Sequence, residues 1–155
     1  MNANVILQDA LHTAKFSFIK EEIKNQAIAI AMASNAPKKM SAILLDKRNR
    51  IISTGVNSYE TTHTQQFYAA VEASKKFKNP NLRKKLYLHA ELNTILKARK
   101  PGHKLVICRI GGHNGKELRN SFCCPICYLY ITTNCRSIKE IHWSTNEQDF
   151  KYIKI

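Results

Sequence analysis

The sequence has few acidic residues: 11 Asp and Glu stand against 25 Lys and Arg in a chain of 155 residues. This scarcity leaves a formal net charge of +14. A strongly basic chain favours anionic partners such as nucleotides, nucleic acids or acidic membranes. A solvated basic surface would have the same composition, so the charge by itself does not distinguish a binding surface from one without a partner.

Long apolar runs and a secretion signal are also lacking. The longest fully apolar run, Ala27 to Ala33, has seven residues, whereas a membrane-spanning helix needs about 20. The N-terminus has no basic segment followed by an apolar segment and a small-residue cleavage site, which a secretory signal would have. We therefore expect a cytoplasmic protein with no membrane partner.

A full set of paired cysteines is excluded, because the chain has an odd number of them: Cys108, Cys123, Cys124, Cys127 and Cys135. An odd count without a secretion signal argues against a disulfide framework. Three of the five lie in the pentapeptide CCPIC. In a cytosolic protein, such clustering indicates metal binding or redox chemistry.

Apolar residues recur at helical and at strand spacing, with turn residues between the segments and no linker or repeat. We expect one domain over 1–155, with helices at 18–34, 64–78, 88–100 and 124–134 and a short helix within 1–15. Strands are expected at 38–45, 51–55, 104–110 and 138–143, and 150–155 is a last strand or a tail. The segments 56–63 and 111–117 are expected to be loops. Helices that alternate with strands imply an α/β fold, a sheet covered by helices.

Two unusual motifs open two of these helices, with a strand between them. His89-Ala90-Glu91 begins one helix, and Cys124-Pro-Ile-Cys127 begins the other. Two thiolates in a Cys-x-x-Cys pair can hold one ion, and a helix N-terminus favours the anionic form of each sulfur. With a His nitrogen they make three ligands that zinc prefers, and a fourth position open to water marks a catalytic zinc site.

Glu91 has a place in such a site. Residues two apart on a helix point about 200° from each other, so His89 and Glu91 can serve one metal only if it lies off the helix end, near the first turn. A carboxylate beside a zinc-bound water can take the proton of that water and return it to a leaving nitrogen.

Each motif alone is weak. Cys-Pro-Ile-Cys could be a redox pair, or half of a structural zinc site whose fourth ligand is one of Cys123, Cys135, Cys108 or His113. The combination of His-x-Glu with Cys-x-x-Cys is more specific, because it is the signature of zinc-dependent nucleobase deaminases. A non-catalytic zinc-stabilised nucleic-acid-binding module remains as an alternative, but it would have no use for a proton shuttle at Glu91.

On these motifs, residues 18–143 resemble the cytidine/deoxycytidylate deaminase superfamily, and HAELN at 89–93 looks closest to deoxycytidylate deaminases. The resemblance implies a three-layer α-β-α fold with a mixed sheet of four to five strands and one extra helix at 66–78. It places the core at about 18–143, an N-terminal extension at 1–17 and a tail or last strand at 144–155. It also implies a nucleotide substrate and a homo-oligomer.

The resemblance further implies the roles of individual residues. His89, Cys124 and Cys127 would bind Zn²⁺, and Glu91 would shuttle protons. Asn57, in GVN, looks like the Asn that contacts the nucleotide sugar. The other substrate contacts that we expect on this basis are Ala90, Asn93 and Ser121.

The sequence departs from the family pattern at Cys123, where the family usually has Pro before its first zinc-binding Cys. The Pro binds nothing, so its loss need not abolish zinc binding, but it leaves an adjacent thiol that could compete for the metal. Cys124 is favoured as the ligand because it alone keeps the two-residue spacing to Cys127.

The motifs leave the substrate open. Hydrolytic attack at C4 of cytosine gives uracil, and attack at C6 of adenine gives hypoxanthine. HAELN favours cytosine in a free nucleotide, converting dCMP to dUMP. The basic runs 75–78, 83–85 and 97–100, with Lys104, favour instead a single-stranded DNA or RNA, on which Phe67, Tyr68, Phe122 or Tyr128 could stack.

Two weaker candidates are His63, in the loop after Asn57, and Arg109, on the strand 104–110. His63 could contact a phosphate or a base, and either residue could equally be structural.

Overall fold

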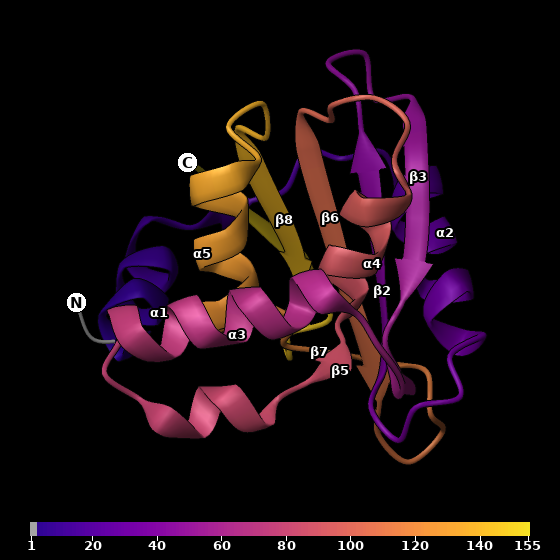
Figure 1. Ribbon diagram of the computed structural model, residues 1–155. Coiled ribbons are helices and arrows are strands. Elements are labelled where there is room, and N and C mark those ends of the chain that lie inside the picture. The colour runs from indigo at the N-terminus through magenta and orange to yellow at the C-terminus, as the bar shows by residue number, and fades with distance from the viewer. Residues whose placement is uncertain (1–2) are drawn as a thin grey trace.

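The computed structural model of the chain describes residues 3–155, and a mixed β-sheet lies at its centre (Figure 1). Within residues 3–155 this sheet has seven strands: six follow the order β1-β9-β8-β6-β2-β3, and β7 pairs with β6. The pair β6–β8 is parallel, and the other neighbours are antiparallel. Its strands are β1 (Lys15–Phe16), β2 (Lys39–Leu45), β3 (Ile51–Val56), β6 (Lys104–Gly111), β7 (Glu117–Arg119), β8 (Glu140–Ser144) and β9 (Phe150–Lys154).

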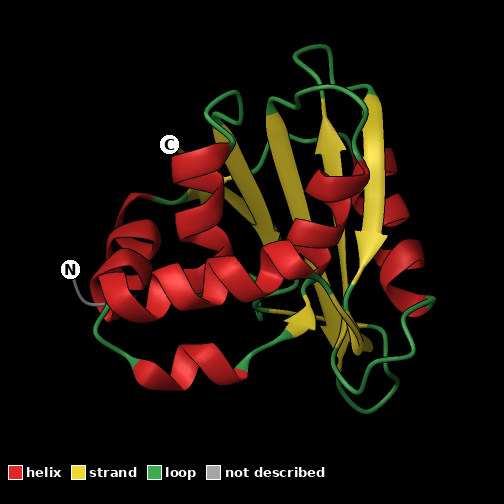
Figure 2. Ribbon diagram, in the orientation of Figure 1, coloured by secondary structure: helices red, strands yellow, loops and turns green. Residues whose placement is uncertain are grey.

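Helices cover both faces of this sheet (Figure 2). They are α1 (Ala3–Thr13), α2 (Glu21–Met32), α3 (Thr64–Lys76), α4 (Ala90–Lys97) and α5 (Pro125–Asn134), together with the 3-10 helix η1 (Pro80–Lys84). A separate two-stranded sheet joins β4 (Ser58–Thr62) to β5 (Tyr87–Leu88). Every helix within the described residues is too short or too polar to cross a membrane.

Alternating side chains of β2 separate the two faces. Ala42 and Leu44 belong to the core cluster that includes Ala90 of α4 and Cys127 and Ile131 of α5. The intervening residues of β2 pack with Ala27 and Ala31 of α2 on the other face. Because successive strand residues point to opposite sides, the continuous apolar run of β2 is what a strand buried on both faces requires. The expected three-layer α/β fold is confirmed.

The sheet is larger than expected, with seven strands in the described range instead of four or five. The segment 150–155 contributes β9, which lies between β8 and β1, so it is a strand and not a tail. The expected loops at 56–63 and 111–117 are wrong in part, because they contain β4 and the first residue of β7. β4 is polar and largely exposed, so it has no apolar alternation from which a strand could be predicted.

The N-terminal segment is attached to the sheet through a buried polar network. The Ser17 hydroxyl contacts His142 Nδ1 at 2.8 Å, and His142 Nε2 contacts Glu140 at 2.9 Å. Lys104 Nζ lies 3.9 Å from Glu140 and donates to Asn49 at 2.8 Å. Burial lowers the pKa of His142 to about 4, so the ring is neutral at physiological pH and acts as a fixed hydrogen-bonding element.

Helix α4 is fixed to the sheet by hydrogen bonds from polar side chains. The Thr94 hydroxyl donates to the carbonyl of Ala42 at 3.0 Å, and Ser53 donates to the carbonyl of Thr94 at 2.8 Å. Gly55 on β3 lies under the same helix: a Cβ there would be 2.6 Å from Thr94 Oγ1 and 3.0 Å from its backbone nitrogen. The absence of a side chain at Gly55 therefore allows α4 to pack closely on the sheet.

We expect Gly55→Ala to lower the free energy of unfolding by about 1–3 kcal/mol, the usual cost of overpacking a buried contact. The added methyl would push α4 away from β3. Urea denaturation would measure the change. Gly111→Ala is the matched control, because its Cβ would come only as near as 3.4 Å to a flexible arginine side chain. Equal effects of the two substitutions would contradict the close packing of α4.

Candidate metal centre

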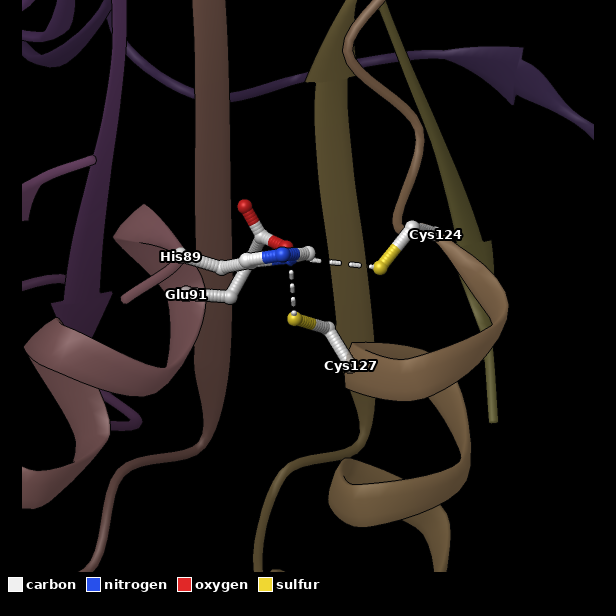
Figure 3. Close-up of side chains that lie close together, drawn as sticks. All are labelled: His89, Glu91, Cys124 and Cys127. Atoms are coloured by element: carbon white, nitrogen blue, oxygen red, sulfur yellow. Dashed lines mark hydrogen bonds between the residues drawn. The ribbon is translucent and has the colours of Figure 1, made fainter. Parts of the chain in front are cut away.

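The two motif-bearing helices begin side by side, and their first residues face each other (Figure 3). His89 and Cys124 are the N-cap residues of α4 and α5, with extended backbone (φ −78° and −65°). Glu91 and Cys127 lie in the first turns of these helices. Neither N-cap side chain caps its own helix, so both are free to point into the space between the two helix ends.

The ligand atoms of His89, Glu91, Cys124 and Cys127 all lie within 4.8 Å of one another. His89 Nδ1 is 3.3 Å from Cys124 Sγ and 3.4 Å from Cys127 Sγ (Figure 3). Typical Zn–S and Zn–N bond lengths place such donors roughly 3.5 Å apart on a tetrahedral zinc. One imidazole nitrogen and two thiolates are also the donor set that zinc prefers. These residues are therefore positioned to bind a metal, and their chemistry fits Zn²⁺.

The groups of the cluster shift one another's pKa values. A hydrogen bond from Cys127 and the nearby His89 ring lower the pKa of Cys124 well below its ordinary value, whereas burial raises the pKa of Cys127. Burial is the largest single effect and acts to lower the pKa of His89, but the charge and hydrogen bond of Cys124 and the charge of Glu91 together outweigh it, and the net shift is upward. A metal must displace the protons of His89 and Cys127, so metal affinity falls as the pH is lowered.

Glu91 is almost fully buried in this cluster. Burial raises the pKa of its carboxyl group, and the neighbouring Cys124 thiolate adds to the rise. A raised pKa means that the carboxyl group holds a proton more readily than a free one, which suits a group that accepts and returns a proton. Glu91 and His89 can face the same point although they are two residues apart, because His89 precedes the first residue of α4 and its side chain does not follow the helical rotation.

A cavity of about 180 Å³ opens onto the cluster and is lined in part by His89, Glu91 and Cys124. Four of the six expected substrate contacts line it as well: Asn57, Ala90, Arg109 and Ser121. They come from the end of β3, the start of α4, β6 and the segment before α5. The fold thus brings together residues from four parts of the chain.

Two of these polar residues already have partners within the protein. The Asn57 side chain accepts hydrogen bonds from Ser34 and from the Met40 backbone, both at 3.0 Å, and donates to the carbonyl of Lys38 at 2.6 Å. The Ser121 hydroxyl donates to the carbonyl of Ile107 at 3.0 Å. Both side chains therefore shape the cavity wall through internal hydrogen bonds.

The remaining two candidates do not line the cavity. His63 is exposed, and its Nδ1 accepts a hydrogen bond from the Gln65 backbone at 3.0 Å, which caps α3. Asn93 donates to the carbonyl of Val56 at 2.9 Å and thereby connects α4 to the end of β3. In the structure, His63 caps α3 and Asn93 joins α4 to β3.

Sequence reasoning missed Lys38, Lys85 and Tyr87, which also line the cavity. The Tyr87 ring stacks on His89 with centroids 4.7 Å apart, and Tyr59 packs edge-on against Tyr87 at 4.4 Å. Lys85 and Tyr87 could have been predicted from the sequence, because they alternate with His89 along the chain. In an extended segment, this spacing places all three side chains on one side.

Cys123 is excluded from the cluster of ligand atoms, although it is next to Cys124 in sequence. It is buried in the core cluster that packs on the sheet. Burial raises the pKa of its thiol well above the ordinary value, as it also does for Cys127, so the position of its sulfur outside the group of neighbouring ligand atoms is what separates Cys123 from the ligand candidates.

We expect Cys124→Ser to weaken zinc binding roughly 100-fold or more, because it removes a thiolate ligand. Cys123→Ser is the control and should keep about one zinc per chain. Zinc content by mass spectrometry and competition with a chromogenic chelator would measure both. Loss of zinc from Cys123→Ser with retention in Cys124→Ser would contradict the ligand assignment.

Comparison with known proteins adds little to this geometry. Neither the protein-family models nor the curated protein sequences contain a match to the chain. Among solved structures, the crystal structure of dCMP deaminase from the cyanophage S-TIM5 in apo form is similar, with a TM-score of 0.46 and 21% sequence identity. The match covers 81% of this chain and 84% of that chain. A likeness of this degree is too slight to assign a substrate.

Proposed function

We propose that the chain is a zinc-dependent hydrolytic deaminase of the cytidine/deoxycytidylate deaminase type, which converts cytosine to uracil in a free nucleotide, dCMP to dUMP. One observation carries the proposal: a buried carboxyl group, Glu91, lies within 4.8 Å of a His-Cys-Cys donor set at a cavity. A purely structural zinc site has no use for a buried carboxylate beside its ligands, because burying an acid is costly.

In this proposal His89, Cys124 and Cys127 hold the metal and Glu91 moves protons. Zinc, when bound, acts as a Lewis acid that makes a water molecule a good nucleophile at neutral pH. Glu91 would take one proton of this water and pass it to the ring nitrogen N3 as the water oxygen bonds to C4. The second proton, from the hydroxyl group then on C4, would go to the exocyclic nitrogen as the bond between that nitrogen and C4 breaks. The products are the uracil carbonyl and ammonia, so one water is consumed for each amine released.

The volume of the cavity favours a single base as the buried part of the substrate. Sites for drug-sized ligands have volumes of about 300–1,000 Å³, and this cavity has about 180 Å³. A pyrimidine would be enclosed, with its sugar and phosphate toward the mouth. Phe122, one of the expected stacking aromatics, lines this cavity.

The charges at the cavity favour a nucleotide over a nucleoside. Lys38, Lys85 and Arg109 line it, and Glu91 is the one acidic residue among the described lining residues. Two or three cationic groups suit one monophosphate.

The positions of the basic runs favour a free nucleotide over a polynucleotide. Lys97 is at the C-terminal end of α4, and Arg99 and Lys100 follow it, whereas the metal cluster is at the helix start. Lys104 is buried and paired with Glu140. Of these basic runs, Lys85 alone is among the described residues that line the cavity.

We further propose that copies of the chain associate. Phe67 and Tyr68 are exposed on α3, and neither is among the residues that line the cavity. Tyr68 borders a groove of about 660 Å³ between α3 and α5. Exposed aromatic side chains beside a groove are typical of contact surfaces between proteins.

We expect the zinc-loaded protein to convert dCMP to dUMP, and Glu91→Gln to lower the rate by about 10²–10⁴-fold while it retains zinc, because an amide cannot accept the proton. Ammonia release and uracil formation would be measured with dCMP, dCTP, cytidine and a cytosine-containing single-stranded oligonucleotide. Turnover of the oligonucleotide alone would show a polynucleotide enzyme. No turnover of any of them by zinc-loaded protein would reject cytosine as the target.

We expect Lys85→Ala to raise KM for dCMP about tenfold, since it removes a charged contact to the phosphate, with little change for deoxycytidine. Steady-state kinetics on both substrates would measure the difference. Lys84→Ala is the control, because Lys84 is on η1 and does not line the cavity. An equal rise in KM for dCMP and for deoxycytidine would mean that Lys85 does not contact the phosphate.

A further inference from the structure

Gln66 on α3 is a fully buried polar residue near the metal cluster. Its neighbours on the inward side of the helix are small and apolar: Ala69, Ala70 and Ala73. Its side-chain Nε2 has no hydrogen-bond partner among the described residues. A buried amide that is only partly satisfied costs stability relative to an apolar side chain of the same size. Packing alone therefore does not account for glutamine at this position.

Among the described residues, the Gln66 side chain makes one hydrogen bond, and its partner is the backbone of a metal-ligand candidate. Its Oε1 accepts from the His89 N–H at 3.2 Å, across 23 residues of sequence. Many helices satisfy the N-cap N–H with a Glu or Gln at the third helical position. In α4 that position is Leu92, which cannot accept a hydrogen bond. Gln66 supplies the missing acceptor from another helix.

The hydrogen bond from His89 N–H to Gln66 restrains the His89 backbone, which the contacts of the imidazole ring do not hold. The imidazole is already limited on one face by the stacked Tyr87 ring, at 4.7 Å, and at Nδ1 by the two cysteine sulfurs. Those contacts act on the ring, whereas Gln66 holds the backbone from which the ring projects. Together they determine where Nδ1 lies.

We infer that Gln66 is a positioning residue: by holding the His89 N–H, it places His89 Nδ1 opposite Cys124 and Cys127 in a geometry ready for metal. This inference rests on the proposed zinc site. It also gives a role to α3, the extra helix that the family resemblance does not account for, because α3 carries Gln66. Metal ligands need placement within about 0.5 Å, and loss of a residue that orients a ligand commonly weakens metal affinity 10–100-fold.

The test compares three variants in the full chain. Gln66→Met keeps the length of the side chain and removes the acceptor. Gln66→Glu keeps an oxygen at the same place. Gln65→Met is the matched control, because Gln65 is the neighbouring residue on α3 and is exposed. Each would be titrated with Co²⁺, whose thiolate charge-transfer and visible bands report the ligand geometry, and with zinc against a chelator. Thermal unfolding of the metal-free proteins would be followed in parallel.

We expect Gln66→Met to bind both metals about tenfold more weakly, with altered cobalt bands. Its metal-free form should unfold close to the wild-type temperature, because the unsatisfied amide is lost together with the His89 hydrogen bond. Gln66→Glu should restore affinity to within about threefold, and Gln65→Met should match the wild type.

Three outcomes would overturn the inference. Unchanged affinity and cobalt bands in Gln66→Met would show that Gln66 only fills space. A metal-free Gln66→Met that unfolds far below the wild type, with no rescue by Gln66→Glu, would show a role in folding alone. A wild-type protein that binds neither cobalt nor zinc would overturn the proposed function and this inference together, whereas the first two outcomes leave the proposed function standing.

Discussion

The approach of two helix N-termini is the constraint on which the rest of the site depends. α4 and α5 are short, and each begins at a residue with extended backbone whose side chain points away from its own helix, toward the other. Both helix ends favour negative charge nearby, which supports a thiolate at Cys124 and a carboxylate at Glu91. The sheet holds them in place, because α4 and α5 pack on the same face through one core cluster.

The groups that the proposed function needs are also groups whose burial destabilises the fold. Glu91, His89 and Cys127 are buried, and Cys124 is partly buried. Burial raises the pKa values of Glu91 and Cys127, whereas hydrogen bonds and charges within the cluster lower the pKa of Cys124 and, against the effect of burial, raise that of His89. Bringing such groups together without a cation costs free energy. A divalent metal would offset that cost, so metal binding and stability of the fold should be coupled.

The residues around the cluster divide into those that face the cavity and those that hold it in shape. Lys38, Lys85 and Arg109 add positive charge to the cavity. Asn57 and Ser121 use their hydrogen bonds to fix the wall, and Thr94 with Gly55 fixes α4 on the sheet. The proposed nucleotide substrate, with a single monophosphate at the mouth of the cavity, agrees with this division, because the other basic runs lie elsewhere.

The sequence by itself determined the α/β class, most helix positions and the four residues of the cluster, because apolar periodicity and motif spacing are local properties. It did not determine β1 or β4, whose residues become strands only through pairing with distant segments, or β7, a three-residue strand that pairs with the nearby end of β6. Nor could it separate Asn57, which lines the cavity, from His63, which caps a helix. The hydrogen bond between Gln66 and His89 joins α3 to the residue that precedes α4, 23 residues away in sequence, so the tertiary structure alone decided it.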